Sequence, residues 1–178
     1  IQRGGFAAFI SSAIENQGTI VAQLGTIALA GGDMVTLGID GTGFISVAID
    51  TPAASKVFDA EGNPVTNQIK NTGTLAADGG MVLIKAESVP DLFTHAINLD
   101  GYVRAEAFEE KDGTIKLVTT GSVKIDGKLR ATNIIIGDTL EGMPSSIQMP
   151  HGQLTAEESV SIAAYNIVIN SNALLTSI

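Results

Sequence analysis

The residues with the clearest potential for chemistry lie in two similar segments, LDGYVRA and IDGKLRA. When these segments are aligned, Asp100 lies beside Asp126 and Arg104 beside Arg130. Stacked carboxylates and arginines bind Ca²⁺ and acidic sugars in enzymes that are built on β-coils, and carboxylate oxygens are the ligands that Ca²⁺ prefers. A lyase-like site acting on polysaccharide is therefore one interpretation of this pattern.

The alternative is that the same residues only shape turns. An Asp-Gly pair is an ordinary turn signal. Asp100 and Arg104 are also four residues apart, which is roughly 13 Å along an extended strand, so their charged groups would not converge. We therefore predict no catalytic residue and no enzymatic activity.

Other candidate sites give weaker signals. Residues 40–43 (DGTG) lack the further carboxylates of a calcium loop, and we interpret them as a hairpin turn. Residues 31–33 (GGD) lack the Lys-Ser/Thr of a phosphate loop. His95 and His151 are far apart in the sequence and no HExxH motif is present, so surface or packing roles are expected for both. The charged residues 109–112 indicate a solvated loop. The sequence thus predicts no metal site and no cofactor.

Composition narrows the classes of protein. Of the 178 residues, 44% are hydrophobic but only 4% are aromatic, so the core must consist of aliphatic side chains and alanine. The formal charge of −9 disfavours nucleic acid and anionic membrane surfaces as partners. Glycine, asparagine or charge interrupts every apolar run, so membrane insertion is not expected. The chain begins at Ile1 without a leader pattern, and we expect a piece of something longer.

A repeated motif must position these residues. The pattern Gly, any residue, aliphatic, any residue, Ala, with an aliphatic residue upstream of the glycine, recurs along the chain and becomes more degenerate. Its glycines are Gly18, Gly73, Gly101, Gly127 and Gly152. The first gap of 55 residues is about two units, and the later gaps are 28, 26 and 25 residues. Short β-type runs that recur with such a period predict a solenoid of parallel β-coils.

The strands within a unit show a period of two. Ile20 and Ala22 are expected to face inward, while Thr19 and Val21 face outward. The turn at residues 23–25 shifts the phase, so that the next inward residues are Ile27 and Leu29.

Equivalent residues of neighbouring coils should stack. Asn16 and Asn71 occupy a bend where asparagine can form hydrogen bonds along the stack. The repeated glycines are expected to adopt positive φ. Exposed β-branched residues, including Thr74 and Thr119, should form flat outer faces.

Three segments do not fit the repeat. Residues 34–50 alternate on either side of DGTG, which predicts a hairpin outside the coil. Residues 58–65 (FDAEGNPV) are rich in turn formers and indicate a second hairpin or a loop. Residues 88–97 predict one short helical turn, because Ser88 can cap it and Pro90 fits its first turn.

Two segments of the chain, residues 25–50 and residues 69–86, resemble the filamentous-haemagglutinin family of large secreted exoproteins, the two-partner-secretion adhesins of Gram-negative bacteria. The resemblance extends over nearly the whole chain. It implies a right-handed parallel β-helix, export through a dedicated outer-membrane transporter, and a role in adhesion, haem acquisition or contact-dependent competition. The family's secretion domain carries an Asn-Pro-Asn motif, whereas Asn63-Pro64 is followed here by Val65. We therefore expect this piece to lie downstream of the secretion signal or at its trailing edge.

We therefore predict an all-β chain in which residues 1–178 form a single β-helix segment, with a hairpin at residues 34–50 and one short helical turn. The predicted function is non-enzymatic: a stiff rod in a secreted, cell-surface adhesin, which supports attachment to host or neighbouring cells. The full-length protein would have an outer-membrane transporter and a surface receptor or glycan as partners. Two alternatives are a polysaccharide-acting β-helix enzyme and a secretion module that the transporter recognises.

Overall fold

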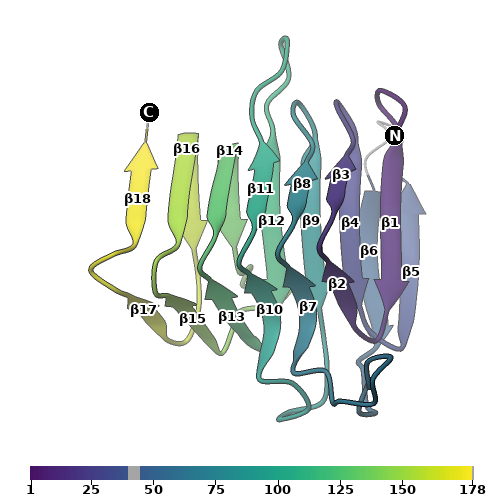
Figure 1. Ribbon diagram of the computed structural model, residues 1–178. Coiled ribbons are helices and arrows are strands. Elements are labelled where there is room, and N and C mark those ends of the chain that lie inside the picture. The colour runs from purple at the N-terminus through teal and green to yellow at the C-terminus, as the bar shows by residue number, and fades with distance from the viewer. Residues whose placement is uncertain (40–44, 178) are drawn as a thin grey trace.

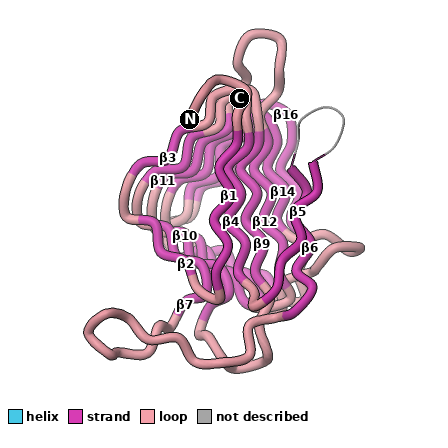
Figure 2. The backbone as a smooth tube through the Cα atoms, turned by 90° about the vertical axis from the view of Figure 1, so that its right-hand side faces the viewer, coloured by secondary structure: helices cyan, strands magenta, loops and turns pink. Residues whose placement is uncertain are grey.

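The fold is all-β. The computed structural model describes residues 1–39 and 45–177, and this part of the chain contains no helix. Most strands run parallel, in a ten-stranded sheet and a six-stranded sheet, and a separate two-stranded sheet is antiparallel. From the N-terminus to the C-terminus, each set of strands lies beside the previous one (Figure 1). The two large sheets curl around a common interior without closing, as the view along the row of strands shows (Figure 2).

The six-stranded sheet consists of β2 (Ile14–Asn16), β7 (Asn67–Asn71), β10 (His95–Leu99), β13 (Ser122–Ile125), β15 (Ser146–Met149) and β17 (Ile167–Ile169). The ten-stranded sheet consists of β1 (Phe6–Ser11), β3 (Thr19–Val21), β4 (Thr26–Gly31), β8 (Thr74–Ala76), β9 (Met81–Ala86), β11 (Tyr102–Ala105), β12 (Thr114–Thr119), β14 (Lys128–Ile136), β16 (Gln153–Ile162) and β18 (Leu174–Ser177). The antiparallel pair is β5 (Met34–Ile39) and β6 (Ile45–Thr51).

The strands follow one another as repeat units. The unit β2, β3, β4 is followed by β7, β8, β9 and then by β10, β11, β12, and each strand pairs in parallel with its counterpart in the next unit. The next two units are β13, β14 and β15, β16. In each of them one long strand, β14 or β16, occupies the positions of both the second and the third strand. The register sets Ile14 beside Ile69 and Asn16 beside Asn71. The expected pairing of residues 55 positions apart is therefore confirmed. The expectation that this gap spans two units is wrong, because the units of Gly18 and Gly73 are adjacent and β5, β6 and the loop after them occupy the extra length.

The interior consists of aliphatic columns that run across the units. One column joins the central inward residues of the six-stranded sheet: Ile14, Ile69, Ile97, Val123, Ile147 and Ile167. Its four middle members are fully buried. Burying such a side chain contributes about 1.5–3 kcal/mol, so the columns supply most of the stability of a chain that has few aromatic residues.

The repeated glycines do not adopt positive φ, and this prediction is wrong. The described glycines in the left-handed region are Gly4, Gly62, Gly79, Gly137 and Gly142. The five glycines of the repeat, Gly18, Gly73, Gly101, Gly127 and Gly152, have ordinary φ and form what we call the glycine ladder.

Close approach of neighbouring backbones explains the glycine ladder. A Cβ atom on Gly73 would overlap the carbonyl oxygen of Gly18, and a Cβ on Gly101 would overlap that of Gly73. The residue after each later glycine of the ladder donates its N–H to the carbonyl of the preceding member, as in the bond from Tyr102 N to Gly73 O at 2.9 Å. The ladder therefore needs the missing side chain rather than unusual φ.

The predicted hairpin at residues 34–50 is confirmed as the antiparallel pair β5 and β6. It packs on the outer face of β4 and β9, where Ile45 and Val47 contact Ala28, Ala30 and Leu83 in a second apolar cluster. Both faces of β4 are consequently buried. The proposed turn at residues 40–43 lies outside the described residues.

Residues 58–65 form the expected turn, with an antiparallel bridge between Phe58 and Pro64.

The predicted helical turn at residues 88–97 is wrong. Ser88 forms a parallel bridge with Ala53, and the backbone N–H of Val89 donates to the Ala53 carbonyl at 2.9 Å. Asp91 has a φ of 61°, which a right-handed helix does not contain. Tertiary pairing with Ala53 therefore replaces the local helical bonds. A helix long and apolar enough to cross a membrane is absent from the described part of the chain.

One of the β-branched residues that were expected to be exposed on the outer faces is buried instead. Thr19 and Val21 are exposed and Thr74 is half-buried, but Thr119 is fully buried. Thr119 continues the inward alternation of Ile115 and Leu117 and pairs in register with the buried Ala86, so it faces the interior rather than an outer face. Its hydroxyl accepts a hydrogen bond from the Gly121 N–H at 3.0 Å. The expected asparagine stack is confirmed, because Asn16 Nδ2 donates to Asn71 Oδ1 at 2.7 Å.

The glycine ladder predicts unequal effects of one substitution. Gly101→Ala should lower the free energy of unfolding by about 1–3 kcal/mol, the usual range for an overpacked site, because its Cβ would overlap Gly73. Gly18→Ala is the matched control at the open end of the ladder, where the nearest atom to a Cβ is Asn16 Oδ1 at 3.9 Å. It should change stability by less than about 0.5 kcal/mol. Urea unfolding followed by circular dichroism measures both, and equal losses would contradict the explanation.

Candidate functional site

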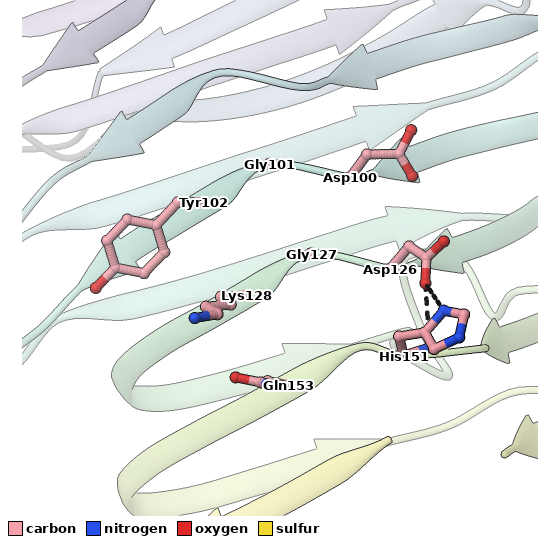
Figure 3. Close-up of a pocket in the computed structure, with 8 residues that line it drawn as sticks. All are labelled: Asp100, Gly101, Tyr102, Asp126, Gly127, Lys128, His151 and Gln153. Atoms are coloured by element: carbon pink, nitrogen blue, oxygen red, sulfur yellow. Dashed lines mark hydrogen bonds and ion pairs between the residues drawn. The ribbon is translucent and has the colours of Figure 1, made fainter. Parts of the chain in front are cut away.

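The two aspartates that the sequence singled out lie at the same corner of neighbouring repeat units. Asp100 follows β10 and Asp126 follows β13, and each directly precedes a glycine of the ladder. Because β10 and β13 pair in parallel register, the two carboxylates stack at this corner. The predicted juxtaposition of Asp100 and Asp126 is therefore present (Figure 3).

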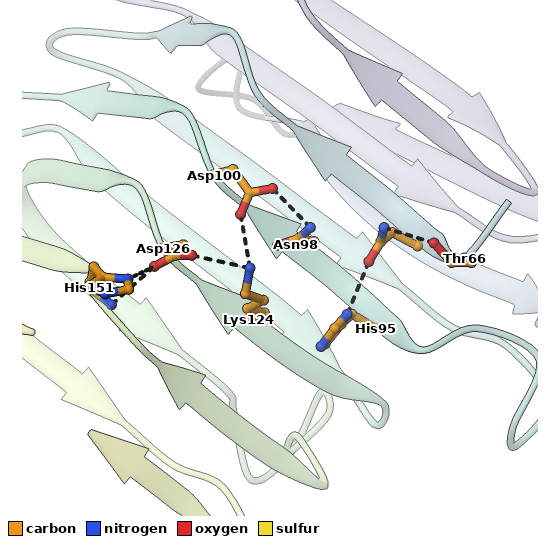
Figure 4. Close-up of polar contacts among 8 residues, drawn as sticks. Thr66, His95, Asn98, Asp100, Lys124, Asp126 and His151 are labelled. Atoms are coloured by element: carbon orange, nitrogen blue, oxygen red, sulfur yellow. Dashed lines mark hydrogen bonds and ion pairs between the residues drawn. The ribbon is translucent and has the colours of Figure 1, made fainter. Parts of the chain in front are cut away.

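Lys124 bridges the two carboxylates. Its Nζ lies 3.4 Å from Asp100 Oδ1 and 3.2 Å from Asp126 Oδ2 (Figure 4). Burial lowers the pKa of Lys124, but the hydrogen bond to Asp126 and the charge of Asp100 outweigh burial and raise the pKa above its ordinary value. Asn98 extends the chain of contacts, since its Nδ2 donates to Asp100 Oδ2 at 3.1 Å. The ammonium thus neutralises two carboxylates that would otherwise repel each other.

His151 forms the other end of this polar chain. Its Nδ1 lies 2.8 Å from Asp126 Oδ1, and its backbone N–H donates to the same oxygen at 3.1 Å. The hydrogen bond from His151 is the main reason that the pKa of Asp126 lies below its ordinary value of 3.8; burial opposes the shift and Lys124 supports it. The side chain of His151 is largely exposed, so this contact lies at the surface.

The two arginines form a second, separate cluster. Arg104 and Arg130 are paired in register on β11 and β14, as the alignment predicted. Arg104 forms a bidentate ion pair with Asp78, with distances of 2.6 Å from Nη2 to Oδ2 and 3.0 Å from Nε to Oδ1. Glu106 accepts from Arg130 Nε at 2.6 Å. The guanidinium groups therefore have their own carboxylate partners and do not converge with the Asp100 and Asp126 pair.

A shallow groove of about 270 Å³ runs over the glycine ladder between two rows of side chains. Its floor is the bare backbone of Gly101 and Gly127. One wall consists of Asp100, Asp126 and His151, and the opposite wall consists of Tyr102, Lys128 and Gln153 (Figure 3). Because the ladder excludes side chains from the corner, the groove follows directly from the repeat. It offers carboxylates, an ammonium, a phenol and an amide to an extended polar ligand.

The remaining candidates occupy separate places. His95 Nδ1 lies 3.1 Å from Asn67 Oδ1, and burial together with the charge of Lys124 lowers the pKa of His95 (Figure 4). Gly31 ends β4 and residues 32–33 form a bend before β5, where Asp33 accepts a hydrogen bond from Ser12 Oγ at 2.8 Å. Residues 109–112 are exposed at the tip of a loop, where Glu109 pairs with Arg3. Within residues 1–39 and 45–177, no group of three or more metal-ligating side chains is present.

The sequence did not lead us to predict two residues that contact Asp126, Lys124 and His151. Lys124 precedes Asp126 by two residues, and its side chain points outward at the same corner. His151 directly precedes Gly152, as Asp126 precedes Gly127, so the spacing of the repeat already placed it one unit away. Extending the alignment by one residue before each glycine would have predicted the contact between Asp126 and His151.

The lowered pKa of Asp126 predicts a specific acid sensitivity. The unfolded chain binds a proton at this carboxyl near pH 3.8, whereas the folded chain binds it only at lower pH. The stabilisation is therefore present above that pH and is lost as the pH falls through the folded pKa. In thermal melts between pH 5 and pH 2, we expect Asp126→Asn to lose less stability on acidification than the wild type. Asp112→Asn, which alters an exposed loop carboxylate, should follow the wild-type profile, and identical profiles for all three proteins would contradict this role.

Comparisons of this chain with models of protein families, with curated proteins and with solved structures give no match.

Proposed function

We propose that this chain is a segment of right-handed parallel β-helix in a secreted, filamentous-haemagglutinin-like exoprotein. In this proposal it acts as a non-enzymatic rod at the surface of a Gram-negative bacterium and supports attachment to host or neighbouring cells. The full-length protein would leave the cell through an outer-membrane two-partner-secretion transporter.

The parallel register of successive repeat units is the observation that supports the proposal most. Each strand of one unit pairs with the equivalent strand of the next, so backbone hydrogen bonds and aliphatic columns run continuously along the row. Such a row resists bending, because bending would break these bonds on one side. A stiff support that holds a binding surface away from the cell is the mechanical role that this construction suits.

The polar clusters also suit a supporting role. Lys124 and His151 already engage the carboxylate of Asp126, and Asp78 and Glu106 engage the two arginines. Each cluster joins neighbouring units across the row. In this proposal they act as lateral ties between units that carry like charges at equivalent positions.

Attachment can be tested with beads coated with the purified chain. We expect these beads to bind epithelial or bacterial cells saturably and the free chain to compete with them. Ile97→Lys is the control, because it places a charge in a fully buried column and should unfold the stacked strands. Beads coated with this variant should not bind. Equal binding of folded and unfolded chains, or no competition by the free chain, would contradict the adhesive role.

A second candidate function is action on acidic polysaccharide, and the groove that contains Asp100 and Asp126 favours it. The chain would be incubated with acidic glycans and Ca²⁺ while new unsaturated ends are measured by absorbance. We expect no turnover. Turnover that is abolished by Asp126→Ala and retained in Asp112→Ala would replace the rod proposal with an enzymatic one.

A further inference from the structure

The outer face of the ten-stranded sheet carries a groove of about 400 Å³ beside the hairpin. Figure 2 shows the hairpin on the outside of this sheet. The floor of the groove consists of outward side chains of β9 and β12, and its walls are residues 45–47 of β6 and Glu141 in the loop after β14. Both β9 and β12 already have a parallel strand on each side, so further coils before or after this chain would not fill the groove.

The groove has the geometry of a strand position. Met81, Leu83 and Lys85 of β9 lie on its floor at intervals of two residues. From Met81 to Lys85 the floor is roughly 13 Å long, at about 3.3 Å per residue. Residues 45–47 are consecutive, so the backbone edge of β6 borders the groove. An extended chain of four or five residues therefore matches the length and the side-chain period of the groove.

The edge of β6 that borders the groove has no backbone partner among the described strands, because β6 pairs with β5 alone. Its sequence, ISVAIDT, contains neither the lysine nor the proline that commonly protects an exposed edge. Unpaired N–H and C=O groups along such an edge are a template for a further strand. They point to a peptide in extended conformation as the occupant, rather than to a helix.

The charges of the groove indicate which peptide fits. Lys116 ties the far wall to the floor, since its Nζ lies 2.9 Å from Glu141 Oε1 and 3.5 Å from Asp138 Oδ2. Lys85, in contrast, forms no ion pair with a residue in 1–39 or 45–177. The groove thus offers an uncompensated ammonium at the end of an apolar floor. A carboxylate is the complementary group.

We propose that a partner protein adds an extended acidic strand to the open edge of β6 in this groove. The strand places apolar side chains over Met81 and Leu83 and a glutamate or aspartate beside Lys85. Backbone hydrogen bonds to β6 supply affinity, and the alternating side chains supply specificity. The inference depends on β6, β9 and Lys85, and it would stand if the adhesive role failed.

The first experiment uses a fluorescein-labelled peptide, TVTVTE, in which two valines and the glutamate share one face of the extended strand. Fluorescence anisotropy with the purified chain should show saturable binding. A second peptide, TVTVTK, should bind at least tenfold more weakly, because its lysine would face Lys85. The absence of saturable binding by TVTVTE, or equal affinities of the two peptides, would overturn the proposal.

Lys85→Glu should reverse this preference, so that the variant binds TVTVTK at least tenfold more tightly than TVTVTE. Lys111→Glu is the matched control, because it changes the net charge equally in an exposed loop between β11 and β12. It should keep the wild-type preference, and melting curves check that both variants are folded. The proposal fails if Lys85→Glu keeps the wild-type preference or if Lys111→Glu loses it. If Lys85→Glu does not fold, the two peptides on the wild type decide the question.

Strand addition itself is tested with two N-methylated forms of TVTVTE. One form is methylated on both valines and the other on the second and third threonines, so each form blocks one edge of the strand. Only the form that is blocked at the edge facing β6 should lose affinity, by at least tenfold. Equal affinities of the two forms would contradict backbone pairing with β6, which uses a single edge.

Discussion

The close approach of one glycine backbone to the next is the constraint on which the rest of the fold depends. At Gly73, Gly101 and Gly127 the carbonyl of the preceding unit occupies the space of a Cβ. That contact fixes the register at the corner, where a parallel strand could otherwise slip by a residue and turn its inward side chains outward. Once the corner is fixed, the aliphatic columns on both sides follow from the alternation of the strands.

Fixed register has an electrostatic consequence, because it stacks like residues on like residues. Asp100 lies beside Asp126, and Arg104 lies beside Arg130. The chain resolves the repulsion by placing opposite charges at neighbouring positions of the same units, which explains why the acidic and basic clusters remain separate. The groove over the ladder has the same origin, since a corner without side chains leaves a gap between two rows of polar side chains.

The repeat could be predicted from the sequence because period, glycine spacing and aliphatic alternation are all local patterns. The inward positions of Ile27 and Leu29 and the hairpin at residues 34–50 are confirmed for this reason. The errors arise where distant segments intervene. Ser88 bonds to Ala53 instead of capping a helix. The exposure expected of Thr119 is a different kind of error, because Thr119 continues the inward alternation of Ile115 and Leu117. The positive φ assigned to the ladder was wrong because glycine also serves where two backbones nearly touch, and spacing alone does not separate the two uses.

Several long excursions leave the fold at one corner. The hairpin and the turn at residues 58–65 lie between β4 and β7, and the loops containing Asp91 and Gly142 lie between β9 and β10 and between β14 and β15. Every one of these junctions joins the last strand of one unit to the first strand of the next. New sequence can enter there without disturbing any strand pairing. This margin of the molecule can therefore diversify between relatives, or carry a grafted foreign epitope, while the scaffold behind it remains the same.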